Sequence, residues 1–315
     1  MRALLLDKNK KKPKFSFSGH ETFVCRYSWI KKAHDALEQN PSIFKEDSAM
    51  AILGVGKNMV YSMKNWMQAF QLVHESEDGL QLEEITSRLF KDSGWDPYLE
   101  DQATLWLLHW FLASNHEKAT TFYYAFNYLN SIEFTKEQLT DELLKYSEEN
   151  GVKVSRNTLV KDVDIFIRTY CQTKANKRGP IEDSLDCPLV ELDLISESSL
   201  RGVYRFLRSD KLTLANEILL FAILDYWNKS CSEMSILSFE DLLYGNGSPG
   251  LIFKIDEDSF AYKLSKIEEL TDGAIKFDET STLRQIYKES EISKFDVLAK
   301  YYKKSLQSLE AGDIK

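Results

Sequence analysis

The stretch SAMAILGVGKNMVYSMKNWMQAF, at residues 48–70, predicts two short helices joined by a turn, which is the pattern of a helix-turn-helix. Gly54 lies where the chain must reverse, and glycine adopts a left-handed backbone there without strain. Val60, Met63 and Met67 recur at the spacing of one apolar helix face. A helix pair broken at glycine also occurs in helical cores that do not bind DNA. The residues on the polar face of the second helix therefore decide between a DNA-binding helix pair and plain core packing.

The polar face of this second helix carries hydrogen-bonding side chains and no acid. In a helix-turn-helix this face enters the major groove of DNA, where amide side chains read adenine and lysine reads guanine or phosphate. The expected DNA contacts are Lys57, Asn58, Tyr61, Ser62, Lys64 and Asn65. Modules of this kind also dock proteins, and that alternative stays open.

A β-hairpin is predicted directly after this helix. Residues 71–73 and 80–82 have the pattern of strands around Asp78-Gly79, and a new helical run extends from Glu83 to Phe90. The segment therefore has the order of a winged helix. The wing carries three acids, Glu75, Glu77 and Asp78. Because these acids would repel phosphates, we do not expect the wing to follow the DNA backbone.

The charge of the chain is concentrated in local patches. Its 315 residues have a formal net charge of −9, so any contact with DNA must come from such a patch. Residues 1–32 hold nine Lys or Arg against two acids. This tail is either solvated or bound to phosphates, and its place ahead of the helix pair favours phosphate contacts. The expected contacts are Lys10, Lys11, Lys12 and Lys14.

Several classes of site and location are excluded by the sequence. Cys25, Cys171, Cys187 and Cys231 show no C-x-x-C pair and no histidines at zinc spacing, so reduced thiols in the cytoplasm are expected. The Gly54–Asn58 segment lacks the Ser or Thr of a phosphate-binding P-loop. The apolar stretches are short or interrupted by polar residues, so no membrane span is expected.

The following part of the chain predicts more helices and a second helix-turn-helix. Residues 135–138 match a capping box, and Ser155 is the expected N-cap of the next helix. The polar face of that helix carries Arg156, Asn157 and Lys161, and its acids Asp162 and Asp164 weaken the case for DNA. Plain helical packing is the alternative.

Composition and periodicity indicate the nature of the remaining segments. Residues 96–113 predict a helix that starts at a proline and lies in a core, because aromatic residues surround it. Residues 182–197 contain six acids and no base, which predicts an acidic linker or docking loop. A third module is predicted from residue 238, with strand-like residues 251–255, a helix to Leu270 and strand-like residues 274–277.

We therefore predict a mainly α protein with small β-hairpins, built from tandem winged-helix-like modules. The predicted parts are residues 1–92 (basic tail and N-terminal winged helix), residues 93–180 (helical domain with the second helix-turn-helix-like unit), residues 181–200 (acidic linker or docking loop) and residues 201–315 (C-terminal helical, winged-helix-like domain).

One cluster ahead of the helix pair has the composition of a reactive site. The segment FSGHETF at residues 17–23 is followed by Arg26. A titratable base, a carboxylate and a cation near a phosphate path are what phosphodiester cleavage requires, so His20, Glu21 and Arg26 are candidate catalytic residues. The alternative is structural, because Ser18 with Glu21 three residues later also matches a capping box.

Five segments in one order resemble a known family. They are FSGHETFVCR, LGVGKNMVYSMKNW, DPYLEDQATLWLLHW, SLDCPLVEL and SPGLIFK, spread over residues 17–254. They are similar to the bacterial family of proteins of unknown function encoded in DNA phosphorothioation gene clusters. Within it, the chain resembles the single-strand-nicking component of Ssp-type systems.

The resemblance implies a role in replacing a non-bridging oxygen of the DNA backbone by sulfur, a modification linked to defence. It implies partners encoded alongside, namely a cysteine desulfurase, an ATP-pyrophosphatase-like enzyme and an ATPase. It also implies nicking of one DNA strand. No cofactor is certain, and Mg²⁺ is a candidate if the chain nicks DNA. It assigns no catalytic residues to this sequence. The alternative function is a non-catalytic winged-helix transcription regulator or adaptor.

Overall fold

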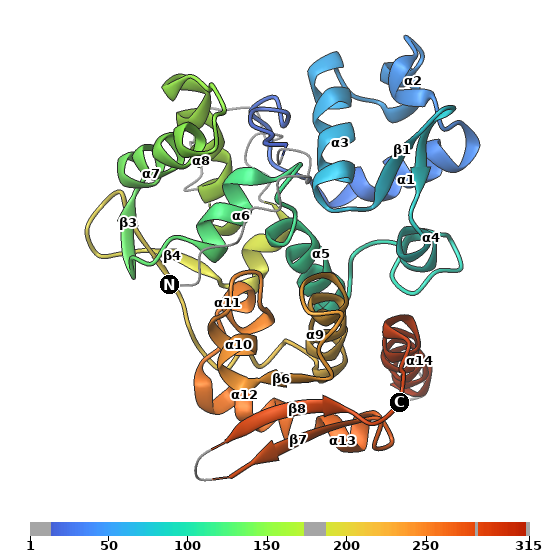
Figure 1. Ribbon diagram of the computed structural model, residues 1–315. Coiled ribbons are helices and arrows are strands. Elements are labelled where there is room, and N and C mark those ends of the chain that lie inside the picture. Colours follow the sequence, from blue (N-terminus) through green and yellow to red (C-terminus); the bar gives the residue numbers. More distant parts are fainter. Residues whose placement is uncertain (1–13, 173–186, 281–282, 313–315) are drawn as a thin grey trace.

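The computed structural model describes residues 14–172, 187–280 and 283–312, and these are mainly helical with small antiparallel sheets. Figure 1 shows three groups of elements, coloured blue, green and orange to red, around a central helix, α5. The expectation of a mainly α protein with small hairpins is confirmed. Lys10, Lys11 and Lys12 lie outside the described residues.

The first unit contains the predicted helix pair and hairpin. Its elements are α1 (Tyr27–Gln39), η1 (Ile43–Lys45), α2 (Ala49–Leu53), α3 (Lys57–Ala69), β1 (Val73–Ser76), β2 (Gly79–Leu82) and α4 (Glu84–Phe90). Gly54 ends α2 with a φ of 66°, the left-handed conformation expected of this glycine. The amide of Leu80 in β2 donates to the carbonyl of Pro41 at 2.9 Å, which ties the hairpin to the segment between α1 and α2.

The second unit follows α5 (Gln102–Ala113). Its elements are α6 (Thr120–Asn127), β3 (Glu133–Thr135), α7 (Lys136–Glu149), α8 (Arg156–Tyr170), η3 (Pro188–Leu192), β4 (Ile195–Glu197) and β5 (Val203–Phe206). The Thr135 hydroxyl and the Gln138 side chain form the predicted capping box at the start of α7, and Ser155 caps α8 as predicted. The three strands pair in the order β3-β5-β4.

The third unit repeats this topology. Its elements are α9 (Asn216–Ser230), β6 (Ile236–Ser238), α10 (Phe239–Tyr244), α11 (Pro249–Phe253), α12 (Glu257–Leu264), α13 (Ile267–Leu270), β7 (Ile275–Glu279), β8 (Arg284–Lys288) and α14 (Lys294–Gly312). The strand order, β6-β8-β7, matches that of the second unit. In both units a strand, helices and a hairpin follow one another, and the last strand lies in the middle. The strand predicted at residues 251–255 is wrong, because these residues lie mainly in α11.

Helix α5 is the centre of the core, as its composition predicts. Every residue from Ala103 to Ala113 is buried. The His109 ring contacts the Tyr170 hydroxyl of α8 at 2.8 Å and the Ile252 carbonyl of α11 at 3.0 Å, so it joins the second and third units. The predicted start at a proline is wrong, because the helix begins at Gln102 with the Asp101 side chain as its N-cap.

The segment predicted as an acidic linker or docking loop is not a free linker in its described part. Leu189, Leu192 and Leu194 of this segment are buried. Strand β4 begins directly after them, at Ile195. Strand β5 pairs with both β3 and β4, so residues 203–206 belong to the second unit and not to the C-terminal part. The acids of this segment are interleaved with apolar residues that pack in the core. Residues 181–186 lie outside the described residues.

In the part of the chain that the structure describes, no helix combines the length and apolar character needed to cross a bilayer.

Candidate nucleic-acid interface

The outer face of α3 presents most of the predicted side chains. Lys57, Asn58 and Tyr61 are exposed, and Lys64 and Asn65 are half-buried. The Lys57 ammonium lies 5.9 Å from the centre of the Tyr61 ring. Because α3 contains no Asp or Glu, the helix itself presents no negative charge to an approaching phosphate.

Ser62 is not on that face, and its predicted DNA contact is wrong. The residue is fully buried, and its hydroxyl donates to the His20 carbonyl at 2.8 Å. Ser62 therefore fixes the preceding loop against α3. Asn65 also lies against this loop, because a Cβ atom added to Gly19 would be 2.1 Å from the Asn65 Oδ1 atom.

The loop at residues 16–23 lies between α3 and α8 (Figure 1). The Asp162 carboxylate of α8 accepts hydrogen bonds from the Ser18 amide at 2.6 Å and from His20 Nε2 at 2.8 Å. On the other side, the Trp66 indole of α3 donates to the Phe23 carbonyl at 3.1 Å. The loop thus connects the first unit to the second through buried hydrogen bonds.

The predicted capping box at Ser18 and Glu21 is wrong. Both residues have left-handed backbones, with φ values of 64° and 48°, so they do not begin a helix. The next helix starts at Tyr27, with Arg26 as its N-cap. The contacts to Asp162 hold the loop in this uncommon conformation.

The structure does not gather the three candidate catalytic residues at one exposed site. His20 is only 5% exposed, and both of its ring nitrogens are engaged, because Nδ1 accepts the Thr22 amide at 3.1 Å and Nε2 faces Asp162. Glu21 is exposed on the loop. His20 lines a small hollow with Asp162, whereas Arg26 lines a separate, larger groove.

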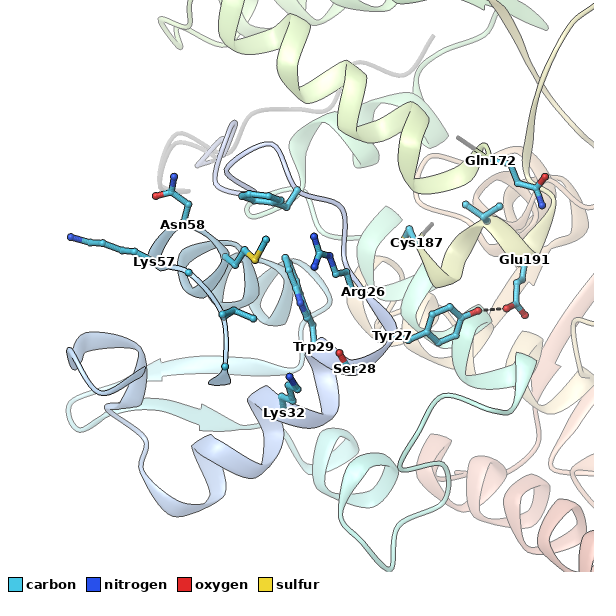
Figure 2. Close-up of a pocket in the computed structure, with 16 residues that line it drawn as sticks. Arg26, Tyr27, Ser28, Trp29, Lys32, Lys57, Asn58, Gln172, Cys187 and Glu191 are labelled. Atoms are coloured by element: carbon cyan, nitrogen blue, oxygen red, sulfur yellow. Dashed lines mark hydrogen bonds between the residues drawn. The ribbon is translucent and has the colours of Figure 1, made fainter. Parts of the chain in front are cut away.

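This larger groove separates the first unit from the end of α8 and from η3, and its volume is about 1030 Å³. In Figure 2, Lys57 and Asn58 lie at one rim, Gln172 and Glu191 lie at the other, and Arg26 lies between them. The remaining labelled lining residues are Tyr27, Ser28, Trp29, Lys32 and Cys187. The exposed face of α3 therefore continues into the groove at its N-terminal end.

The groove has the electrostatics of an anion site. Helices α1 and α3, each of 13 residues, both begin at its wall, and neither has an acid in its first turn or a side-chain cap. The amides at a helix start carry partial positive charge and favour phosphates. Three cations, Arg26, Lys32 and Lys57, add to this charge.

One acid lines the groove at the far rim. The Tyr27 hydroxyl donates a hydrogen bond to the Glu191 carboxylate. Burial and this carboxylate raise the pKa of Tyr27 above its ordinary value, so the phenol stays protonated. The acid is therefore engaged across the groove by a residue of the first unit.

Parts of this site are not predicted by the sequence. In the sequence, Lys32 is one of the basic residues of the N-terminal patch and is not indicated as a DNA contact by itself. No sequence pattern indicates Tyr27 or Trp29. Glu191 reaches the groove from a segment 164 residues after Tyr27, and no local pattern indicates such a contact. Of the predicted tail lysines, Lys14 is described, and it is exposed.

Residues 17–302 match the family described as "Protein of unknown function (DUF4007)". The chain belongs to the DUF4007 family. A solved structure described as "SspB crystal structure" is similar, with 30% sequence identity and a TM-score of 0.82 over 91% of this chain and 88% of that chain. No curated protein matches.

A second structure, described as "Magnesium ion-bound SspB crystal structure", has 30% identity and a TM-score of 0.81 over the same shares of the two chains. The predicted resemblance of this DUF4007 protein to a component of Ssp-type DNA phosphorothioation systems is therefore confirmed at the level of the family.

In the described part of this DUF4007 protein, the side chains do not form a metal centre by themselves. Within residues 14–172, 187–280 and 283–312, no three His, Cys, Asp or Glu side chains converge as ligands of a metal ion. The described donors do not fit a metal centre built by the protein alone, so we propose no step that passes through a metal.

Proposed function

We propose that this DUF4007 protein is the DNA-binding component of a DNA phosphorothioation system and that its repeated units are winged-helix modules. The observation that carries the proposal is the continuous surface formed by the outer face of α3 and the adjoining groove. It combines exposed Lys57 and Asn58 with Arg26, Lys32 and two uncapped helix starts. Cations and free amides at one surface are the groups that bind DNA phosphates.

The order of elements supports the winged-helix interpretation. In the first unit, α2, the Gly54 turn, α3 and the β1-β2 hairpin follow one another, and α3 has the position of a recognition helix. The hairpin carries exposed Glu77 and Asp78 at its turn, while Glu75 forms an ion pair with Lys118, so the turn stays away from the DNA backbone. DNA contact by this unit is thereby assigned to α3 and the groove.

Family membership supports the rest of the proposal. We propose that the chain works with a cysteine desulfurase, an ATP-pyrophosphatase-like enzyme and an ATPase of the same gene cluster. Nicking of one strand is the activity that the resemblance to SspB suggests, and one of the similar solved structures is described as magnesium ion-bound SspB. If this chain nicks DNA, we place the reacting phosphate in the groove beside Arg26 and not at His20, whose ring nitrogens are both engaged.

The binding proposal is tested with the double variant Lys57→Ala, Asn58→Ala. Loss of one bidentate base contact costs about 1 to 3 kcal/mol, and loss of one phosphate contact flattens the plot of log K against log[salt] by about 0.9. The control is Lys266→Ala with Ser265→Ala, two exposed residues of the third unit. A gel-shift titration in which both double variants bind DNA as wild type does, with unchanged melting curves, would remove α3 from the interface.

The nicking proposal is tested with supercoiled plasmid at protein concentrations that saturate binding. Wild type, His20→Ala, Glu21→Ala and Arg26→Ala are incubated with Mg²⁺ or with EDTA. Removing a group that stabilises the reacting phosphate lowers the rate by ~10² or more, so Arg26→Ala should lose nicking while DNA stays bound. No nicking by wild type with any divalent metal would favour the regulator or adaptor function.

A further inference from the structure

We infer that the second unit carries a second DNA-backbone site, formed by the N-terminal half of α8 and the tip of the β4-β5 hairpin. This inference rests on the proposed function and extends it from one contact surface to two. The unit has the same order of helix pair and hairpin as the first, which gives α8 the position that α3 has there. Its ligand is the sugar-phosphate backbone of duplex DNA.

The first observation is that the acids of α8 do not face solvent as free charges. Asp162 is 4% exposed and accepts hydrogen bonds from Ser18, His20 and Thr121. Asp164 forms an ion pair with Lys136. The acids that appeared to oppose DNA binding are therefore turned inward or paired.

The second observation is what remains exposed on α8. Arg156, Asn157 and Lys161 are exposed near its N-terminal end. Arg156 forms an ion pair with Asp141 of α7, which holds the guanidinium at the edge of the helix pair. Asn157 and Lys161 lie on one side of the helix, since residues four apart share a face. A phosphate that approaches this side meets an amide and an ammonium.

The third observation is the charge of the hairpin tip. Residues 198–202 form the turn of the β4-β5 hairpin, where Arg201 is exposed and Gly202 has a φ of 80°. Arg205 of β5 is also exposed. The corresponding hairpin of the first unit ends in Glu77 and Asp78. The second hairpin therefore has the positive charge that a wing needs to follow a DNA backbone.

The position of the DNA follows from the acids near the hairpin. A hollow of about 850 Å³ lies between α8 and the hairpin, and Arg168 and Arg201 line it. Glu137, Asp193 and Glu197 line it as well, together with the paired Lys136 and Asp164. These carboxylates would repel a phosphate inside the hollow, so we place the backbone outside it, in contact with Lys161 of α8 and Arg201 of the hairpin.

The loop at residues 16–23 makes the two sites act on one duplex. It is hydrogen-bonded to α3 through Ser62 and Trp66 and to α8 through Asp162. Figure 1 shows α3 and α8 on either side of this loop, at the same end of the molecule. Buried hydrogen bonds on both sides fix the relative position of the two helices.

The experiment uses the full-length chain and a duplex of roughly 40 base pairs, about four helical turns. The test variant is Lys161→Ala with Arg201→Ala. The matched control is Lys266→Ala with Lys303→Ala, which removes the same charge from two exposed positions of the third unit. The readouts are the salt dependence of the binding constant and a hydroxyl-radical footprint. Thermal unfolding checks that both variants stay folded.

We expect the test variant to flatten the slope of log K against log[salt] by about 0.9 for each phosphate that the protein no longer neutralises, and to protect only one of two backbone segments. The control should keep the wild-type slope and both segments. A single protected segment in wild type, or a test variant that matches the control, would overturn the second site and leave the α3 surface in place. A wild-type protein that protects no DNA would overturn the proposed function as well.

Discussion

At the scale of single residues, the hydrogen-bond partners of Asp162 are not predictable from the sequence. Its carboxylate accepts from the Ser18 amide, from His20 Nε2 and from the Thr121 hydroxyl, at 2.6, 2.8 and 3.0 Å. These donors come from the loop and from α6, so one carboxylate holds together the loop, α6 and α8. His20 belongs to this structural cluster.

The first residue-scale prediction compares two aspartates of α8. Asp162→Ala should lower the free energy of unfolding by about 3 kcal/mol or more, because it leaves buried donors without an acceptor. Asp164→Ala is the control, since its ion pair with Lys136 is partly exposed and contributes at most about 1 kcal/mol. Urea unfolding of both variants is the measurement. Equal decreases would mean that Asp162 does not hold the loop.

The predictability of the candidate interface also differs residue by residue. Helical periodicity is enough to place Lys57, Asn58 and Tyr61 on the outer face of α3. It misplaces Ser62, which lies at the border of the apolar stripe, because its partner is the carbonyl of His20, 42 residues earlier. Periodicity describes one helix by itself and contains no information about a loop that packs on it.

At the scale of elements, the joint between the 16–23 loop and α3 depends on close packing. A Cβ atom at position 19 would lie 2.1 Å from Asn65 Oδ1, so Gly19→Ala should cost about 1 to 3 kcal/mol of stability. In the Asn65→Ala background the same change should cost much less, because the opposing amide is gone. Chemical denaturation of the four proteins of this double-mutant cycle measures the coupling. A coupling near zero would show that the loop moves aside.

Elements with local signals were predicted well, and elements without them were not. Thr135, Ser155 and Gly54 mark the ends of helices through their own backbone hydrogen bonds or conformation, and each was confirmed. The apolar run that forms α11 also fits a strand, because a short apolar run does not distinguish the two. The Ser248 cap and the proline after it were the signal for a helix.

At the scale of the whole molecule, His109 couples stability to pH. Burial lowers its pKa to about 3, so the folded protein keeps the ring neutral while it contacts Tyr170 and Ile252. In the unfolded chain the ring gains a proton near pH 6.5. The stabilisation is therefore fully present above pH 6.5 and declines as the pH falls from 6.5 toward 3.

Protonation of His109 in the unfolded chain should lower the free energy of unfolding by about 2 kcal/mol as the pH falls from 7 to 5. His109→Gln keeps a hydrogen-bond donor and an acceptor but has no titrating group. Between pH 7 and pH 5, the free energy of unfolding of the variant should therefore fall by about 2 kcal/mol less than that of wild type. Urea unfolding at both pH values, for wild type and variant, is the measurement. Parallel decreases in the two proteins would contradict this role of His109.

The arrangement of the units relative to one another is not predictable from the sequence. The repeated helix pairs are visible as patterns, but the pairing of β5 with both β3 and β4 joins residues on either side of the expected linker. Strand order and the packing of α5 depend on contacts between distant segments. Such contacts require the whole chain, whereas the patterns describe short windows of it.

The hydrogen bond from the Ser18 amide to Asp162 makes it possible to measure how often the 16–23 loop separates from α8. Ser18 itself is exposed, so its amide hydrogen would exchange rapidly with deuterium in an ordinary loop. Held by a buried carboxylate, the hydrogen exchanges only when the loop leaves α8. The exchange rate of this one hydrogen therefore reports how often α3 and α8 become free to move apart. Slow exchange would mean that a duplex meets two surfaces whose spacing is already set before binding.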